Sequence, residues 1–178
     1  MPQLSYEFRP FDRLHAATVA AWVADEQELF LLAPGTAWPL TPAKVVGWVK
    51  PQGRAFLLFE DRRDLPCGYA ELNPLRNSPD QIWIGHVVLD PRLRGRGIGR
   101  RLTQLLIEVG LADSQIDRLV MVVFPDNHAA LSCYRATGFR VTRRERHRFA
   151  PRPGDHAMLR LEITRAEALA TGIKPKGR

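Results

Sequence analysis

One stretch of the sequence constrains the fold more than any other. It runs from Ile82 to Ile107 and reads IWIGHVVLDPRLRGRGIGRRLTQLLI. It begins with a mostly apolar segment rich in β-branched residues, which is typical of a strand buried on both faces. Asp90-Pro91 ends this strand, because proline cannot donate a hydrogen bond to a sheet. From Ile98 onward apolar residues recur at helical spacing, so the stretch predicts a strand, a glycine-rich loop and an amphipathic helix.

The predicted loop has the composition of an anion-binding site. Its glycines allow backbone N–H groups to approach a ligand closely, and arginines flank them. The first amides of the following helix lack intrahelical acceptors, and the helix dipole adds positive potential. The loop is not a dinucleotide fingerprint, because the third glycine would fall at Arg100, and it lacks the Gly-Lys-Ser/Thr of a Walker loop. The stretch therefore predicts a phosphate-binding loop of another kind.

Length and composition favour a single globular domain. The chain has 178 residues, of which 45% are hydrophobic and 25% charged. We expect one domain over residues 1–164 and a basic, frayed C-terminal tail over residues 165–178. No apolar run reaches the roughly 20 residues of a membrane span, and no secretory signal pattern begins the chain. A cytoplasmic protein without membrane contact is therefore expected, with Cys67 and Cys133 as reduced thiols and no metal site.

The net charge of +7 allows two interpretations. It marks either an acidic partner or a basic surface combined with a ligand that carries phosphate groups. Arginines gather at residues 92–101 and 140–152. Nucleic-acid binding is an alternative that we do not favour, because no basic and aromatic interleaving of a nucleic-acid module is present.

The remaining pattern alternates short strands with a few helices. Strands are predicted over residues 3–9, 54–60, 66–73, 82–89, 119–124, 139–149 and 157–163. Helices are predicted over residues 11–24, 42–49 and 128–137, besides the one that follows the loop. Residues 25–40 are predicted to be a helix end and a loop.

A second motif follows the loop and its helix. Asn127 leads a short predicted helix that carries Tyr134 and ends in Gly138-Phe139. This segment and the Arg-x-x-Gly-x-Gly loop after Leu-Asp-Pro, in this order, resemble the GNAT superfamily of N-acetyltransferases. The resemblance implies an α/β (α+β) fold: a mixed, mostly antiparallel sheet of about seven strands, flanked by about four helices, whose central strands are splayed.

The resemblance also implies which residues bind acetyl-CoA as the acetyl donor. The pantetheine arm is expected to enter the gap between the splayed strands, where Val87, Val88 and Leu89 would contact it and Asn127 would approach from the other side. Backbone amides of the loop would hold the pyrophosphate. The loop residues are Arg94, Gly95, Arg96, Gly97, Ile98 and Gly99. Tyr134 matches the position of the family's usual acid near the thioester sulfur, and no metal is implied.

The general base is the least defined part of the predicted site. Family members often carry a glutamate early in the strand before the loop, where this chain has Trp83. Glu71, on the neighbouring predicted strand, is our first candidate, directly or through water. His86 has a suitable side chain, but strict alternation along a strand points it away from Trp83 and Gly85, so we expect it to be a packing residue.

The expected activity is transfer of an acetyl group from acetyl-CoA to a primary amine, by direct attack in a ternary complex. The acceptor, a small molecule or a protein amine, is not identified by the sequence. A binding module that retains acyl-CoA without catalysis is an alternative, because no base is evident. A homodimer through the last strands and the tail also stays open.

Overall fold

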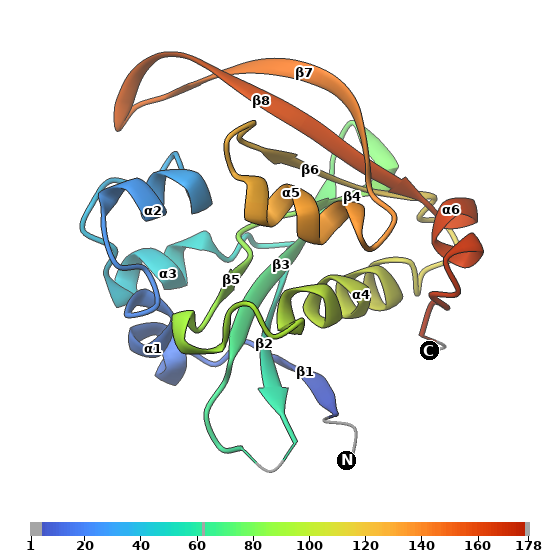
Figure 1. Cartoon of the computed structure of the whole chain (residues 1–178), viewed down its shortest axis with the longest axis horizontal. Coiled ribbons are helices and arrows are strands. Elements are labelled where there is room, and N and C mark those ends of the chain that lie inside the picture. The colour runs from blue at the N-terminus through green and yellow to red at the C-terminus, as the bar shows by residue number, and fades with distance from the viewer. Residues whose placement is uncertain (1–4, 62, 177–178) are drawn as a thin grey trace.

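The protein is built on one twisted sheet. The computed structural model describes residues 5–61 and 63–176, so the beginning of the predicted strand over residues 3–9 lies outside the described residues. The sheet has eight strands in the order β1-β2-β3-β4-β6-β8-β7, with β5 beside β3 (Figure 1). Among the strand pairs that the described residues form, only β4 and β6 run parallel. The predicted mixed, mostly antiparallel sheet is therefore confirmed, with one strand more than expected.

The elements have the following bounds. The strands are β1 (Tyr6–Pro10), β2 (Arg54–Glu60), β3 (Gly68–Leu75), β4 (Ser78–Ile84), β5 (Val88–Leu89), β6 (Arg118–Val123), β7 (Arg140–Phe149) and β8 (Arg152–Thr164). The helices are α1 (Ala16–Ala20), α2 (Glu26–Leu32), α3 (Pro42–Trp48), α4 (Ile98–Gly110), α5 (His128–Arg135) and α6 (Arg165–Ala170). Two 3₁₀ turns, Arg13–His15 and Pro91–Leu93, precede α1 and α4.

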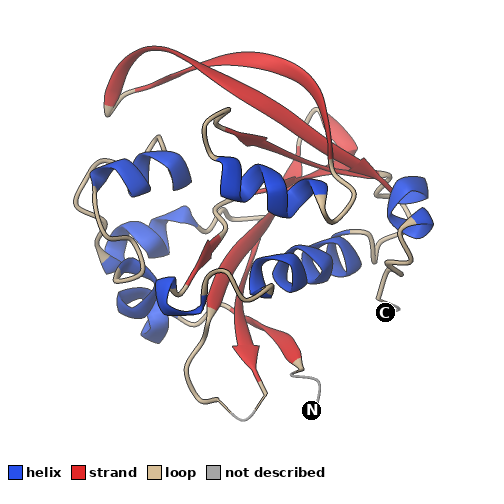
Figure 2. Cartoon of the chain, viewed as in Figure 1, coloured by secondary structure: helices blue, strands red, loops and turns tan. Residues whose placement is uncertain are grey.

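Helices cover the sheet in two groups, which Figure 2 shows as α1–α3 at one side and α4 and α5 at the centre. The larger core lies under α4, α5 and α6, where Leu102, Leu106 and Leu119 are fully buried. The apolar stripe of α4, read from the sequence at helical spacing, supplies much of this core. The second core lies under α1–α3 and includes Val45, Trp48 and the β3 residue Tyr69. The two cores lie on opposite faces of the central strands.

Two segments form helices where none was predicted. Residues 25–40 were expected to be a helix end and a loop, but α2 forms there because the Asp25 carboxylate accepts a hydrogen bond from the Glu28 amide, which caps the helix. The tail was expected to fray, but Thr164 and Glu167 form a capping box at the start of α6. Ile173, beyond α6, is buried in the larger core. Both helices start at a side-chain cap.

The predicted strand over residues 82–89 is broken in two by a β-bulge. The Gly85 amide donates to the Glu71 carbonyl of β3, and Val88 pairs with Tyr69. Two residues, His86 and Val87, therefore stand opposite one residue of β3. The extra residue shifts the alternation of side chains by one, so His86 faces Glu71 on the side of α1–α3. The predicted orientation of His86, away from Gly85, was wrong for this reason.

The same break separates the two central strands. The parallel pairing of β4 with β6 extends only as far as Trp83 and Val120. Beyond that point β5 pairs with β3, and β6 continues beside β8. Figure 1 shows β5 and β6 diverging from each other. A gap between the two strands, bounded at its apex by the bulge, is the feature that positions the candidate site.

Candidate active site

The loop between β5 and α4 presents a row of backbone N–H groups without acceptors. Among the described residues, none of the amides from Gly95 to Arg100 donates a hydrogen bond, and the first that does is the Arg101 amide, to the Gly97 carbonyl at 3.2 Å. The helix cap, Gly97, has no side chain to satisfy them. Six consecutive free donors at the start of a long helix form a cradle for an anion. This segment, Gly95–Arg100, is called the amide cradle below.

Glycine is required at two turns of the amide cradle. Gly95 has φ of 75° and Gly97 has φ of 80°, a left-handed conformation that other L residues adopt only with strain. A third glycine, Gly99, has an ordinary conformation but a close neighbour. A Cβ at that position would lie 3.2 Å from Cys133 Sγ of α5. The glycines therefore shape the loop and bring the start of α4 against α5.

Arg94 has a different role from its neighbours. Its amide already donates to the Pro91 carbonyl at 3.4 Å, so it stands outside the cradle. Its guanidinium pairs with Glu28 of α2 at 2.5 Å and donates to the carbonyls of Trp22 and Leu89 at 3.1 and 3.2 Å. Arg94 thus ties the loop after β5 to the segment around α2. The Glu28 carboxylate is engaged in this pair.

Strand β5 turns part of its backbone toward the gap. The Asp90 amide donates to the Cys67 carbonyl of β3, so alternation turns the amides of Leu89 and Val87 the other way. Val88 pairs with Tyr69 and its side chain packs in the core under α1–α3. Of the three residues predicted to contact the pantetheine arm, Val87 and Leu89 therefore direct their amides into the gap. Val88 directs its amide to β3.

Helix α5 adds two residues predicted from the second motif. Asn127 caps the helix, since its side-chain oxygen accepts a hydrogen bond from the Ala130 amide at 3.2 Å. Tyr134 is buried beside Phe139, with ring centroids 6.1 Å apart. The Tyr134 hydroxyl has no hydrogen-bond partner within residues 5–61 and 63–176. Burial raises the pKa of Tyr134, so the phenol keeps its proton at neutral pH.

Glu71 lies in a buried polar cluster under α3, not at the solvent-exposed position that an isolated strand carboxylate would take. One carboxylate oxygen accepts a hydrogen bond from the Tyr69 hydroxyl at 2.6 Å and lies 2.9 Å from Nδ1 of His86. The other accepts from Nδ2 of Asn73 at 3.3 Å. The Trp48 ring stacks on the His86 ring, with centroids 4.2 Å apart. These five residues, the buried polar cluster, meet at the β-bulge.

Sequence reasoning did not find Trp48, Tyr69 and Asn73 as members of this cluster. Tyr69, Glu71 and Asn73 alternate along β3, so their shared face is a signal present in the sequence. Gly85 was a further signal, because a Cβ there would lie 2.7 Å from Glu71 Oε2. The contact with Trp48 had no local signal, since it depends on how α3 packs on the sheet.

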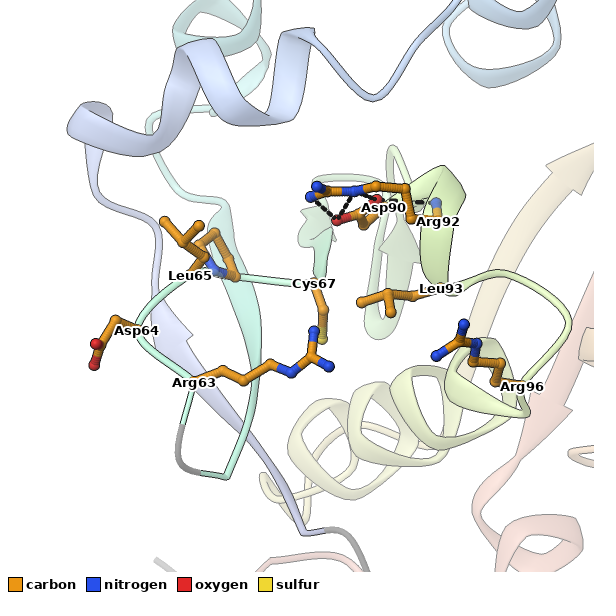
Figure 3. Close-up of a pocket in the computed structure, with 9 residues that line it drawn as sticks. Arg63, Asp64, Leu65, Cys67, Asp90, Arg92, Leu93 and Arg96 are labelled. Carbon is orange, nitrogen blue, oxygen red and sulfur yellow. Dashed lines mark hydrogen bonds and ion pairs between the residues drawn. The ribbon is translucent and has the colours of Figure 1, made fainter.

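A pocket of about 510 Å³ lies on another side of the loop, between residues 63–67 and residues 90–96. Figure 3 shows Arg63 and Arg96 pointing into it and Arg92 paired with Asp90. Two of the three arginines are matched by buried carboxylates, Arg63 by Glu60 at 2.5 Å and Arg92 by Asp90 at 2.6 Å. The Arg92 guanidinium also lowers the pKa of Asp90. These pairs leave the pocket with little excess positive charge.

Aromatic residues join α2 to the β7–β8 hairpin. Phe30 of α2 packs on Phe124, which follows β6, with ring centroids 5.1 Å apart. Phe149 and Met158 of the hairpin complete this small core. The Arg152 guanidinium lies over the Phe30 ring. Figure 1 shows the hairpin arching over α2 and α5.

The described residues offer neither a metal cluster nor a membrane span. No group of three or more His, Cys, Asp or Glu side chains lies close enough to hold a metal ion in residues 5–61 and 63–176. No helix in that part of the chain is long and apolar enough to cross a bilayer.

Comparisons with known proteins agree with this geometry. Residues 10–139 match the model of the acetyltransferase (GNAT) family. The N-alpha-acetyltransferase RimI of Mycobacterium tuberculosis is 38% identical over 82 residues, which are 45% of this chain and 49% of that protein. The mycothiol acetyltransferase of Mycobacterium avium is 34% identical over 101 residues, which are 52% of this chain and 32% of that protein. The chain thus matches half or less of the length of these curated relatives.

Solved structures share the fold at low identity. Aminoglycoside acetyltransferase AAC(6')-Ib in complex with coenzyme A superposes with a TM-score of 0.74 at 18% identity, covering 94% of this chain and 99% of that one. Spermidine N-acetyltransferase from Vibrio cholerae, in complex with CoA and spermine, gives 0.75 at 13% identity, covering 92% and 98%. The splayed sheet, the amide cradle and the family match lead to one conclusion: this chain belongs to the acetyltransferase (GNAT) family.

Proposed function

We propose that the protein is an N-acetyltransferase that moves an acetyl group from acetyl-CoA to a primary amine. The observation that carries this proposal is the amide cradle, whose six free N–H groups follow β5, the strand that borders the gap. A diphosphate matches such a donor row in charge and in its number of acceptor oxygens. The family match and the CoA complexes of similarly folded proteins support the same ligand.

The gap suits the rest of the donor molecule. Its wall carries the outward amides of Val87 and Leu89, and a pantetheine arm contains amide carbonyls that can accept from them as a neighbouring strand would. The Asn127 side chain caps α5 through its oxygen, which leaves its NH₂ group able to donate toward the arm. Acetyl-CoA supplies the activated acetyl group. Backbone groups of this chain would hold it, together with one asparagine.

Tyr134 is proposed to donate a proton to the departing sulfur. Its hydroxyl is not committed to another group of the described chain, and burial keeps it protonated by raising its pKa. An uncommitted phenol on α5, the helix whose Cys133 lies against Gly99 at the start of α4, is a suitable general acid. Glu71 is proposed as the carboxylate that accepts the proton of the attacking ammonium, directly or through another group.

Direct attack by the amine in a ternary complex is preferred over an acetylated enzyme. The cysteines are poor nucleophiles, since burial raises the pKa of Cys67 to about 11 and also raises the pKa of Cys133. Both are free thiols, in keeping with the reduced cytoplasm in which we propose the protein acts.

The test begins with calorimetry of the purified chain with acetyl-CoA, with S-acetylpantetheine, which lacks the diphosphate and the adenosine, as the control. Release of free CoA is then measured over a panel of amines that includes small polyamines and peptide N-termini. We expect micromolar binding of acetyl-CoA only, and initial-rate lines that intersect as a ternary complex requires. Binding without CoA release from any amine would favour the non-catalytic acyl-CoA module. Retention on nucleic acid at high salt would favour the nucleic-acid alternative.

A further inference from the structure

Glu71 and His86, the two titratable members of the buried polar cluster, differ in how far solvent reaches them. The Glu71 side chain is 2% exposed, whereas the His86 side chain is 23% exposed. Each carboxylate oxygen of Glu71 already accepts at least one hydrogen bond, from Tyr69 and from Asn73. An amine that enters the gap therefore cannot touch Glu71 without moving the groups that cover it. Of these two side chains, the imidazole of His86 is the one that solvent or a substrate can reach.

The contacts of His86 fix which nitrogen is available. Its Nδ1 lies 2.9 Å from Glu71 Oε1, a distance at which a neutral imidazole donates its N–H to a carboxylate. Stacking on Trp48, with rings inclined by 18°, holds the plane of the imidazole. Nε2 has no hydrogen-bond partner among the described residues. The ring is therefore oriented with its acceptor nitrogen free.

The β-bulge places this nitrogen at the apex of the gap. His86 follows the last pairing of β4 with β6, at Trp83 and Val120, and immediately precedes Val87. In the proposed function the Val87 amide contacts the pantetheine arm farther from the amide cradle than Leu89 does, and so toward the acetyl end of the donor. Without the extra residue of the bulge, His86 would face the core under α4 and could not meet Glu71. Gly85 supports the arrangement, because a Cβ there would displace the Glu71 carboxylate.

We propose that His86 is the catalytic residue that takes the proton from the attacking amine, and that Glu71 is a positioning residue that orients it. The inference rests on the proposed function and refines it, because it replaces a directly acting Glu71 by a Glu71–His86 pair.

The proton transfers balance. Nε2 of His86 accepts one proton from the substrate ammonium, and Glu71 stabilises the imidazolium. The nitrogen lone pair forms the new bond to the acetyl carbon, and Tyr134 donates its proton to the sulfur as the carbon–sulfur bond breaks. The second proton of the nitrogen returns to the Tyr134 phenolate through water, and His86 releases its own to solvent. One ammonium and one thioester yield one amide, one thiol and one proton.

The first test needs no substrate. In a two-bond ¹H–¹⁵N spectrum of the ligand-free protein at pH 8, His86 is identified as the signal absent from His86→Gln. We expect it to carry its proton on Nδ1 and to lose this preference in Glu71→Gln. A proton on Nε2 in the wild-type protein overturns the inference, and so does a spectrum that Glu71→Gln leaves unchanged. A role of Glu71 in folding alone would not move the tautomer.

The second test is kinetic and uses the best amine of the panel. His86→Gln is expected to lower kcat by about 100-fold and to remove the acidic limb of the pH–rate profile. Glu71 and Tyr69, which stay in place in this variant, are not expected to replace the lost base. The affinity for acetyl-CoA should stay within twofold. Added imidazole should restore part of the activity of His86→Ala. His15→Gln, at a half-buried histidine on Phe59, is the matched control and should keep the wild-type rate.

The outcomes separate the two proposals. A wild-type rate and an unchanged acidic limb in His86→Gln overturn the inference and leave the proposed function intact. Failure of the wild-type protein to acetylate any amine overturns the proposed function, and the catalytic role of His86 with it. If neither His86 variant folds, the wild-type tautomer and the pH–rate profile of Glu71→Gln decide, because a directly acting Glu71 predicts complete loss of the limb there.

Discussion

The two sides of the proposed reaction centre are built from different parts of the chain. The amide cradle consists of backbone donors from six consecutive residues, and no side chain of the loop is needed to present them. The buried polar cluster consists of side chains from α3, β3 and the β-bulge. In the amide cradle, which faces acetyl-CoA, the positive potential comes from peptide dipoles, so binding there is expected to be insensitive to pH. The buried polar cluster, which faces the amine, contains ionisable side chains, so its action is expected to depend on pH.

Two buried tyrosines also differ between the two sides of the proposed reaction centre. The hydroxyl of Tyr134 of α5 has no hydrogen-bond partner among the described residues, whereas Tyr69 of β3 donates its hydroxyl to Glu71 at 2.6 Å. Burial raises the pKa of both. Removal of the hydroxyl should therefore affect catalysis at one tyrosine and stability at the other, which gives the two most direct ways to test the comparison.

The largest effect is expected from Tyr134→Phe. Loss of the proton donor should lower kcat by about 100-fold, while the affinity for acetyl-CoA stays within twofold. Unfolding in urea should change by less than about 0.5 kcal/mol, because the lost hydroxyl had no hydrogen bond. Steady-state rates, calorimetry and urea titration measure the three quantities. A turnover rate equal to that of the wild type would remove Tyr134 from the mechanism.

The next largest effect is expected from Tyr69→Phe, in which stability, and not turnover, is the quantity that should fall most. A hydrogen bond from a buried hydroxyl to a buried carboxylate is lost, so the free energy of unfolding should fall by about 2 kcal/mol. The midpoint of urea unfolding at pH 7 measures this loss, with Tyr134→Phe as the matched control. Equal midpoints for both variants would contradict the assignment of Tyr69 to a buried network.

A smaller effect is expected in the cradle itself. Gly97→Ala forces a side chain into a left-handed conformation at φ of 80°, and relief of that strain would turn amides away from the ligand. We expect the affinity for acetyl-CoA to fall about tenfold, or about 1.4 kcal/mol. Gly172→Ala, at φ of 83° and also in open space, is the control. It should lose similar stability and keep its affinity, and an equal loss of affinity in both would argue against the cradle.

The amide cradle could be predicted from the sequence because it is local. A strand, three glycines and the start of an amphipathic helix adjoin one another along the chain, so spacing alone defines the backbone geometry. Arg94, which was also predicted to hold the pyrophosphate, donates its amide within a 3₁₀ turn, and its side chain reaches α2. Most strand positions followed from the same kind of pattern, whereas the splayed sheet was implied by the resemblance alone.

The buried polar cluster could not be predicted in the same way. Alternation along a strand assigns each side chain to a face, but one inserted residue reverses the assignment for all residues after it. The bulge at His86 and Val87 depends on pairing with β3, which no local pattern reports. Glu71 was selected for its chemistry, but its burial depends on Tyr69, Asn73 and α3, and these contacts are set by tertiary packing.

Helix α6 supplies the smallest effect and shows that a local signal can be overlooked. Thr164-Arg-Ala-Glu167 is a capping box that can be found in the sequence, although the Ala-, Lys- and Gly-rich composition around it suggested fraying. Hydrogen bonds from Thr164 and the nearby Arg140 lower the pKa of Glu167 below its ordinary value of 4.5. A lowered pKa in the folded state stabilises the protein above the pKa of the unfolded chain, and this stabilisation is lost as the pH falls through the folded value.

Glu167→Ala should therefore lower the free energy of unfolding by about 1 kcal/mol at pH 7, and the difference from the wild type should shrink below pH 4.5. Urea titrations at pH 7 and pH 3.5 measure both values. The variant should keep the wild-type affinity for acetyl-CoA, because α6 lies against the larger core and contributes neither to the amide cradle nor to the buried polar cluster. A difference that persists unchanged at pH 3.5 would show that the glutamate acts through packing and not through its charge. In that case the contribution of Glu167 would come from tertiary contacts, as in the buried polar cluster. It would not come from neighbours in the chain, as the geometry of the amide cradle does.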